Sequence, residues 1–194
     1  HRIQIFDTEG NFISTFGSKG NNNGQFNNPR GICVDSNDNI YVCDSSNHRI
    51  QIFDSKGKFL STFGSYGNGN GQFNGPHGIT INSKGNIIVS DFNNHRIQIF
   101  DSEGKFISTF GSQGKFLSSF GSEGNGKFNN PRGICVDLND NILVCDFGYH
   151  RVQIFGPNGG YIGQFKVNQP MDIIFDYETQ NIIVCGNDNK ISIF

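Results

Sequence analysis

A six-residue phrase recurs along this chain and constrains its fold more than any other feature. HRIQIF stands at residues 1–6, 48–53 and 95–100, HRVQIF follows at 150–155, and the shorter ISIF occupies 191–194. The first two intervals between the histidines are both 47 residues long. The third interval is 55 residues, and the fourth, to the matching Asn189, is 39. A period of about 20–50 residues indicates one small structural unit repeated along the chain.

The period divides the chain into four repeats within one domain. The predicted domain covers 1–194, and its repeats are 1–47, 48–94, 95–149 and 150–194. Between Gly78 and Phe110 the runs GITI, NIIVS, HRIQIF and KFISTF are rich in β-branched and aromatic residues, and the gaps between them hold Gly, Asn, Asp or Ser. Such runs favour strands and such gaps favour tight turns. A four-stranded antiparallel sheet of this size cannot bury both faces alone, but copies packed around a shared axis can. We therefore predict an all-β fold, a β-propeller built of four-stranded antiparallel blades.

Composition and charge narrow the classes of partner. A net charge of −2 gives no bulk attraction to DNA, RNA or anionic lipid. The chain has no run of 18 apolar residues, so we expect no contact with a membrane interior. An odd number of cysteines, five, with no secretory signal and no glycosylation sequon, favours a cytoplasmic protein without a disulfide framework.

The cysteines follow the repeat rather than a metal-ligand spacing. Cys33 and Cys43 are ten residues apart, and so are Cys135 and Cys145. The second repeat has threonine and serine at these two positions, Thr80 and Ser90. A position that accepts Cys, Thr or Ser predicts a small buried slot. We therefore expect buried structural thiols, no metal site and no cofactor.

Essentially the whole chain resembles a run of NHL repeats; three segments carry the match, and the last copy is the weakest. In the first segment the match is carried by NPRGICVD (28–35), NIYVCD (39–44) and NHRIQIFDSKGKFLSTFG (47–64). GPHGITIN with NNHRIQIFDSEGKFISTFG repeats it, as does NPRGICVD with ILVCD and HRVQIF. The Asn-His pair is kept at 47–48 and 94–95, becomes Tyr-His at 149–150 and is lost at 189–190. The resemblance implies a propeller, usually of six blades, in which the GICVD run lines the axis and the NIYVCD, HRIQIF and KFLSTF runs follow outward.

This blade order predicts how the chain is divided into strands. Residues 1–16 would form a third–fourth pair, three complete blades would follow, and the chain would close on the first three strands of another, giving 17 strands. We expect about four blades in an open arc or in part of a six-bladed ring, with the rest of the propeller or of a parent protein missing. KFISTFGSQG (105–114) is copied at once as KFLSSFGSEG (115–124), which predicts an extra outer strand or a loop.

Features kept in every repeat are interpreted as scaffold. A phenylalanine in the loop before each first strand is predicted to fill a gap between blades. An aspartate after each second strand is predicted to accept N–H groups from the loop that follows it. Because these aspartates lie on different blades, they do not form a close acid–base pair, and we expect no catalytic residues. The residues are Phe26, Phe73, Phe128, Asp44, Asp91 and Asp146.

Features that differ between repeats are candidates for binding. In a propeller the fourth-to-first and second-to-third loops share one face, called the loop face below. Guanidinium and imidazole groups beside aromatic rings suit a protein partner, and equally the phosphates and bases of single-stranded RNA. The predicted binding residues on this face are Arg30, His48, His77, Phe92, His95, Arg132, Phe147, Tyr149 and His150.

We expect a non-catalytic interaction scaffold that binds a protein partner through the loop face. The resemblance implies a place in RING/B-box/coiled-coil proteins of the TRIM-NHL type, where such propellers select targets for ubiquitin ligation or bind mRNA. The chain has no RING cysteines, so ligase activity would lie outside it. Three alternatives stay open: single-stranded RNA binding, a propeller lyase or lactonase whose residues cannot be mapped here, and a degenerate fragment with no function.

Overall fold

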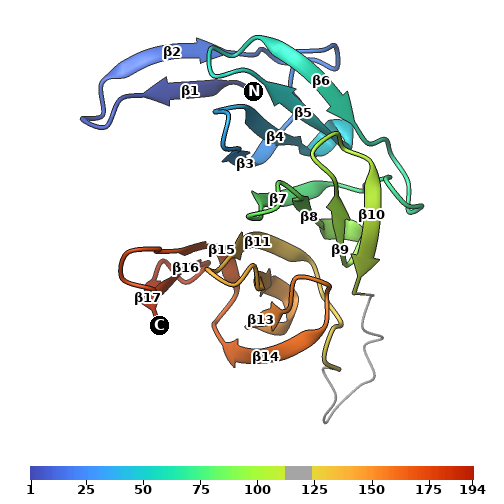
Figure 1. Ribbon diagram of the computed structural model, residues 1–194, viewed down its shortest axis with the longest axis vertical. Coiled ribbons are helices and arrows are strands. Elements are labelled where there is room, and N and C mark those ends of the chain that lie inside the picture. Colours follow the sequence, from blue (N-terminus) through green and yellow to red (C-terminus); the bar gives the residue numbers. More distant parts are fainter. Residues whose placement is uncertain (112–123) are drawn as a thin grey trace.

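The repeat folds as a succession of short strands (Figure 1). The computed structural model describes residues 1–111 and 124–194, so most of the copied segment 115–124 lies outside the described residues. The strands are β1 (Ile3–Phe6), β2 (Phe12–Phe16), β3 (Pro29–Val34), β4 (Ile40–Asp44), β5 (Arg49–Phe53), β6 (Phe59–Phe63), β7 (Pro76–Ile81), β8 (Ile87–Asp91), β9 (Arg96–Phe100), β10 (Phe106–Phe110), β11 (Pro131–Val136), β12 (Ile142–Asp146), β13 (Arg151–Phe155), β14 (Tyr161–Lys166), β15 (Pro170–Phe175), β16 (Ile182–Gly186) and β17 (Ile191–Ile193).

These strands form five antiparallel sheets, and each sheet keeps the order of the chain. They are β1-β2, β3 to β6, β7 to β10, β11 to β14, and β15 to β17. The division into a pair, three complete blades and a set of three, predicted from the repeat, is therefore confirmed. Figure 1 shows the sheets following one another in an arc, with the N-terminal pair and the C-terminal set at its two ends.

The first strand of each blade lies innermost. β3 contacts β7, β7 contacts β11, and β11 contacts β15. These four strands line an axial cavity of about 340 Å³, to which they contribute Ile32, Ile79, Ile134 and Ile173. Consecutive sheets that share an axis in this way form a β-propeller, the fold class predicted from the sequence.

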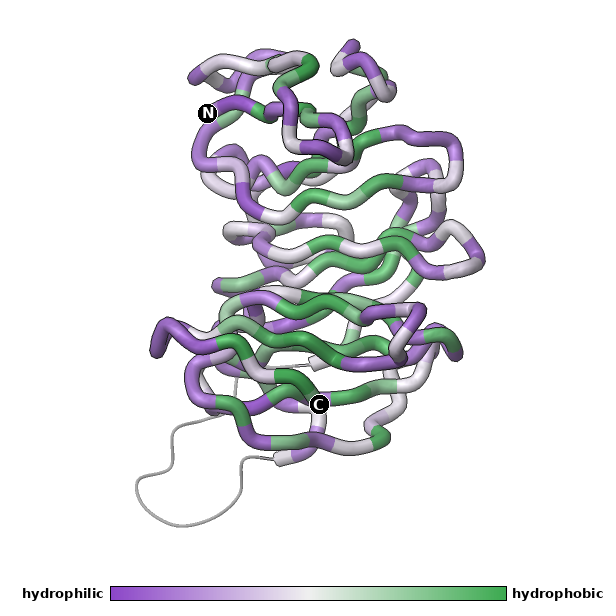
Figure 2. Tube along the Cα trace, turned by 90° about the vertical axis from the view of Figure 1, so that its left-hand side faces the viewer, coloured by the Kyte–Doolittle hydropathy of each residue, from purple (hydrophilic) through white to green (hydrophobic). Residues whose placement is uncertain are grey.

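The hydrophobic core lies between neighbouring blades. The second strands β4, β8 and β12 are buried along their whole length, because a blade covers each of their faces. Phe73 is fully buried between blades, with its ring centroid 6.3 Å from Phe63 on β6 and 5.5 Å from Phe100 on β9. Phe26 and Phe128 are likewise fully buried, which confirms the predicted gap-filling role. Figure 2 shows hydrophobic residues along the strands and hydrophilic residues in the loops.

Small side chains fill the predicted slots between inner strands. Ser90 shows what such a slot does: its hydroxyl accepts the N–H of Gly78 at 2.7 Å and donates to the carbonyl of Arg132 at 2.6 Å, linking β7 to β11. Among the cysteines, Cys43, Cys135 and Cys145 are buried and Cys33 is half-buried, whereas Cys185 is exposed. Cys185, on β16 of the last sheet, lies outside the paired positions for which the slot was predicted. Burial raises the pKa of Cys33 and of Cys135 to about 12, so these thiols stay protonated at neutral pH.

A buried polar network holds the loop that leads into each blade. Asp91 is fully buried, and its Oδ1 accepts the N–H of Asn74 at 2.7 Å. Its Oδ2 accepts hydrogen bonds from Arg96 Nε at 2.8 Å, Asn94 Nδ2 at 2.9 Å and Gln98 Nε2 at 3.3 Å. The predicted acceptance of backbone N–H groups is confirmed. The loop is the one preceding the first strand, however, and not the one following the aspartate.

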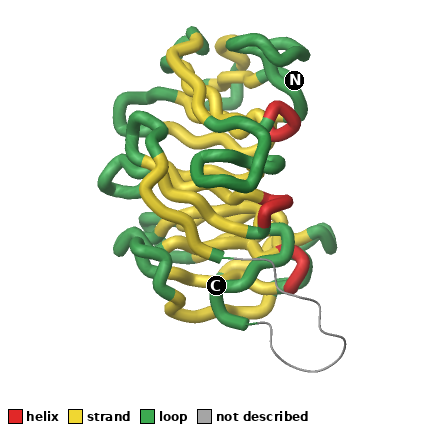
Figure 3. Tube along the Cα trace, turned by 90° about the vertical axis from the view of Figure 1, so that its right-hand side faces the viewer, coloured by secondary structure: helices red, strands yellow, loops and turns green. Residues whose placement is uncertain are grey.

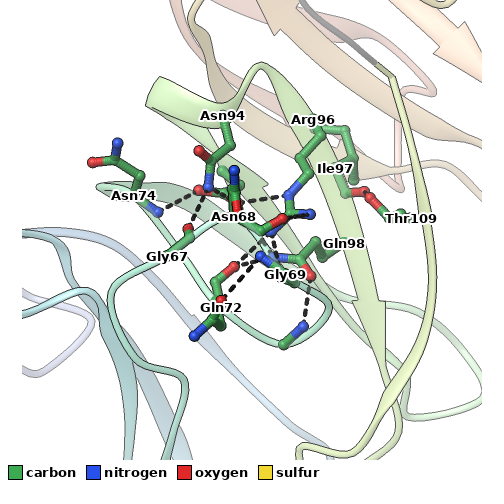
Figure 4. Close-up of polar contacts among 12 residues, drawn as sticks. Gly67, Asn68, Gly69, Gln72, Asn74, Asn94, Arg96, Ile97, Gln98 and Thr109 are labelled. Carbon is green, nitrogen blue, oxygen red and sulfur yellow. Dashed lines mark hydrogen bonds and ion pairs between the residues drawn. The ribbon is translucent and has the colours of Figure 1, made fainter.

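The arginine of this network also binds the backbone of the loop that precedes the blade. Arg96 donates to the carbonyls of Asn68, Gly69 and Gln72 at 2.7–2.8 Å, which fixes the loop before β7 (Figure 4). The same aspartate–arginine pair recurs at 2.8 Å as Asp44–Arg49 and as Asp146–Arg151. Each of the three four-stranded blades therefore contains this ion pair beneath its loop face, with the carboxylate fully buried.

Candidate binding site

A short 3₁₀ turn forms the second-to-third corner in each of the three four-stranded blades. The turns are η1 (Ser45–Asn47), η2 (Phe92–Asn94) and η3 (Phe147–Tyr149), and Figure 3 shows them one after another along the same side. Each turn ends at a histidine in the left-handed region, with φ of 54–56° at His48, His95 and His150. This geometry places the histidine side chain over the next blade.

The corner histidines tie neighbouring blades together. His48 Nδ1 accepts the N–H of Gly75, which directly precedes β7, at 3.1 Å. His95 Nδ1 accepts the N–H of Asn130 at 3.1 Å, and His150 Nδ1 accepts that of Gln169 at 3.3 Å. The second-to-third corners therefore meet the fourth-to-first loops, as expected for one shared face.

A pocket of about 290 Å³ opens on the loop face between the blades. Arg30, His77 and Arg132 reach it from the second residue of β3, β7 and β11, respectively. Phe92 on η2 and the corner residue His48 also line it. Five of the nine predicted binding residues thus converge on a single pocket. The remaining lining residues are Asn28, Ser45, Ser46, Gly75 and Asn93.

Aromatic rings hold the charged groups at this pocket in place. The His77 ring stacks on Phe92, with centroids 5.6 Å apart and planes 28° from parallel. The Arg132 guanidinium carbon lies 3.8 Å from the Phe147 ring centroid and 5.5 Å from that of Phe92. Arg132 Nη1 contacts Met171 Sδ, while its Nε is buried and has no hydrogen-bond partner. These contacts orient Arg132 without neutralising its charge.

The electrostatic surroundings of the pocket are positive. Burial, and then the charges of Arg30 and Arg132, lower the pKa of His77 to about 4. Burial and the charge of Arg30 also lower the pKa of Arg132. Like charges held close together disfavour each other's charged form. His77 is therefore neutral at pH 7, and two guanidinium groups flank it.

The other four predicted residues lie apart from this pocket. The Phe147 ring contacts Arg132 but does not line this pocket. His95 accepts the hydrogen bond from Asn130 of the following blade. Tyr149 and His150 line a second pocket of about 500 Å³ beside the buried Arg151. The Arg151 guanidinium carbon lies 5.1 Å from the centroid of the Tyr149 ring. The second pocket is formed by η3, β13 and β14, in the same blade that contributes Arg132 to the first pocket.

Sequence reasoning missed several residues of the pocket and its surroundings. Asn28 and Gly75 line the pocket because they stand just before an inner strand, a place that sequence position alone could have indicated. The aspartate–arginine pairs were missed as well, although both residues recur in phase with the repeat. The signal was their fixed five-residue separation, which puts Asp44 directly opposite Arg49 across β4 and β5.

His77 offers a direct test of the pocket's electrostatics. We expect its pKa, followed by the NMR shifts of the imidazole, to lie near 4, with Arg30→Gln raising it and the exposed Lys84→Gln leaving it unchanged. Because the ordinary value is 6.5, the unfolded chain binds this proton more readily than the folded chain as pH falls from 6.5 to 4. The contribution of His77 to stability is thus lost over that window. A measured pKa near 6.5 would contradict this description.

The described residues contain neither a membrane-spanning helix nor a cluster of metal ligands. Within residues 1–111 and 124–194, no helix has both the length and the apolarity needed to cross a membrane. In the same part of the chain, no three His, Cys, Asp or Glu side chains gather as a metal site.

The family model described as NHL repeat matches residues 26–53, 73–100 and 128–155. The chain contains three NHL repeats. Each matched NHL segment begins at a gap-filling phenylalanine and ends at the last residue of a third strand. The two rings pack against each other: in the NHL repeat at 73–100, the centroids of Phe73 and Phe100 are 5.5 Å apart. The comparison with curated proteins found no match to the chain.

Solved structures similar to this NHL-repeat chain support the fold. Virginiamycin B lyase from Staphylococcus aureus is 17% identical, with a TM-score of 0.62, over 100% of this chain and 62% of that one. A streptogramin B lyase is 17% identical, with a TM-score of 0.57, over 86% of this chain and 54% of that one. The WD40 β-propeller domain of Doa1 is 17% identical, with a TM-score of 0.63, over 93% and 54%. The chain spans between half and two thirds of these proteins, and at such identities the likeness shows the fold alone.

Proposed function

We propose that this NHL-repeat propeller is a non-catalytic scaffold that binds a protein partner through its loop face. The observation that carries the proposal is the convergence of Arg30, His77, Phe92 and Arg132, from three blades, on one pocket. Arginine and aromatic residues are enriched at the centres of protein interfaces, where a pocket excludes water from an anchoring side chain. The scaffold beneath is rigid, because a buried ion pair and a histidine hydrogen bond fix each loop.

Target recognition for a RING-type ubiquitin ligase is the finer form of this proposal. The NHL repeats support it, since the domain offers a recognition face while any ligase chemistry would belong to other segments of such a protein. A cytoplasmic setting suits the five free cysteines, which a reducing compartment would keep reduced. The lyase alternative gains no support at the level of residues, because the two lyases share only the fold.

A paired selection tests the proposal. We would select a displayed peptide library and a random single-stranded RNA library against the purified chain, against Arg30→Glu and against Lys84→Glu. Arg30 is exposed on the loop face, and Lys84 is exposed on a turn of the opposite face. We expect peptides that bind the wild type and Lys84→Glu equally and lose about tenfold or more in affinity for Arg30→Glu.

Two outcomes would contradict protein binding through this face. One is the absence of any peptide whose binding depends on Arg30. The other is enrichment of RNA alone, with affinity that falls steeply as salt rises, which would favour the RNA alternative.

A further inference from the structure

The arginines of the loop-face pocket differ in pairing from the third-strand arginines of the three complete blades. Arg49, Arg96 and Arg151 each donate to a buried aspartate at 2.8 Å. Arg30 and Arg132 form no ion pair within the described part of the chain. Among the described residues that line the pocket there is also no aspartate or glutamate. In the three complete blades, the third-strand arginine is thus neutralised, whereas Arg30 and Arg132 on the first strands are uncompensated.

The two arginines without an ion pair line a space of limited size. Arg132 Nε is buried without a hydrogen-bond partner, and the guanidinium is fixed over Phe147. Arg30, Ser45, Ser46 and Asn93 line the same 290 Å³ as Arg132, and the Asn93 amide donates to Asn74 Oδ1 at 3.2 Å. Guanidinium groups present planar pairs of N–H donors that match a carboxylate or a phosphoryl group. A side chain that carries one such group would fit this volume.

We infer that this pocket binds one anionic side chain of a peptide partner, either a carboxylate or a phosphorylated residue. The inference rests on the proposed function and adds the chemistry of the anchoring group. The bound oxygens would accept hydrogen bonds from Arg30 and Arg132, and His77 would supply a third polar group between them. The uncompensated charge of the arginines would draw the anion to the loop face and hold it there.

RNA fits the same contacts less well. Base stacking needs aromatic faces that are open to solvent, with a basic groove that follows the backbone. One face of Phe92 is already covered by His77, and one face of Phe147 by Arg132. Tyr149 is likewise engaged with Arg151. The open donors form a single pocket rather than a tract, as one anchored side chain requires.

Titration with simple anions tests the pocket without any partner. We would follow the His77 imidazole and the Arg side-chain resonances by NMR at constant ionic strength while adding inorganic phosphate, acetate or, as a control, chloride. We expect saturable binding of phosphate or acetate with a dissociation constant of about 1–10 mM, the range for a single small group. The anion should also raise the pKa of His77 toward its ordinary value. Tighter binding of phosphate would indicate a phosphorylated side chain, and tighter binding of acetate a carboxylate.

Matched variants separate this inference from its alternatives. Arg30→Gln should weaken the anion about tenfold or more, whereas Lys84→Gln should leave its affinity unchanged. The absence of saturation by phosphate and by acetate, or equal binding by Arg30→Gln, would overturn the inference. An oligouridine that binds through Arg30 while both anions fail would indicate RNA instead. If both anions fail and Arg30→Glu still loses its selected peptides, the proposed function stands and only the anionic anchor is wrong.

Discussion

Replacing Asp91 with asparagine is expected to lower the free energy of unfolding by about 3–5 kcal/mol. The carboxylate is fully buried and accepts four hydrogen bonds, among them the 2.8 Å bond from Arg96. Asparagine keeps the shape but removes the charge, so Arg96 would remain beneath the loop without its counterion. Urea denaturation of the purified chain measures the loss.

The exposed Glu103→Gln provides the matched control for this change, and we expect an effect of at most about 0.5 kcal/mol. A double variant that also carries Arg96→Met should lose less stability than the sum of the single changes, because the two residues form one pair. A loss below about 1 kcal/mol for Asp91→Asn would show that the ion pair contributes little beyond its hydrogen bonds.

Replacing Phe73 with alanine is expected to cost a similar amount, about 3–5 kcal/mol. The ring is fully buried between the blade of β3 to β6 and the blade of β7 to β10, in contact with Phe63 and Phe100. Its removal leaves a cavity at a junction of two sheets, and strands on both sides are too well anchored to collapse into it. Thermal and urea unfolding would both report the loss.

Leu60→Ala, at a side chain on β6 that is 48% exposed, is the comparison for Phe73. We expect it to change stability by about 0.5 kcal/mol or less. Phe73→Leu should fall between the two, since it preserves part of the apolar volume. Equal losses for Phe73→Ala and Leu60→Ala would contradict a structural role at the blade junction.

The period of the sequence predicted most of the fold for a physical reason. Register in a sheet depends on which residues face the core, and HRIQIF repeats that pattern in phase, so β1, β5, β9 and β13 occupy equivalent places. The gap-filling role of Phe73 was predictable too, because a large apolar residue in a polar loop needs a buried place. The exposure of Cys185 was not predictable, because it depends on what packs against the last sheet.

The sequence predicted which face of the propeller carries the candidate site, but not which of its residues form one pocket. Sequence position placed Arg30, His77 and Arg132 on equivalent residues of three blades, but the distances between them depend on the angle at which blades meet. The contacts of His77 with Phe92 and of Arg132 with Phe147 each lie within one blade. The angle between blades brings Arg132 to 5.5 Å from the ring of Phe92 in the preceding blade, a contact that no single repeat encodes. It also separates Tyr149 and His150 into a second pocket.

The histidine bonds from each corner to the following blade give the domain a direction. Because every sheet packs mainly against the two beside it, the molecule behaves as a one-dimensional array in which each sheet is stabilised by its nearest neighbours. Loosening would then begin at the outermost modules, β1-β2 and β15 to β17, and progress inward. Slow amide exchange should accordingly be concentrated in the β7 to β10 module, halfway along the array.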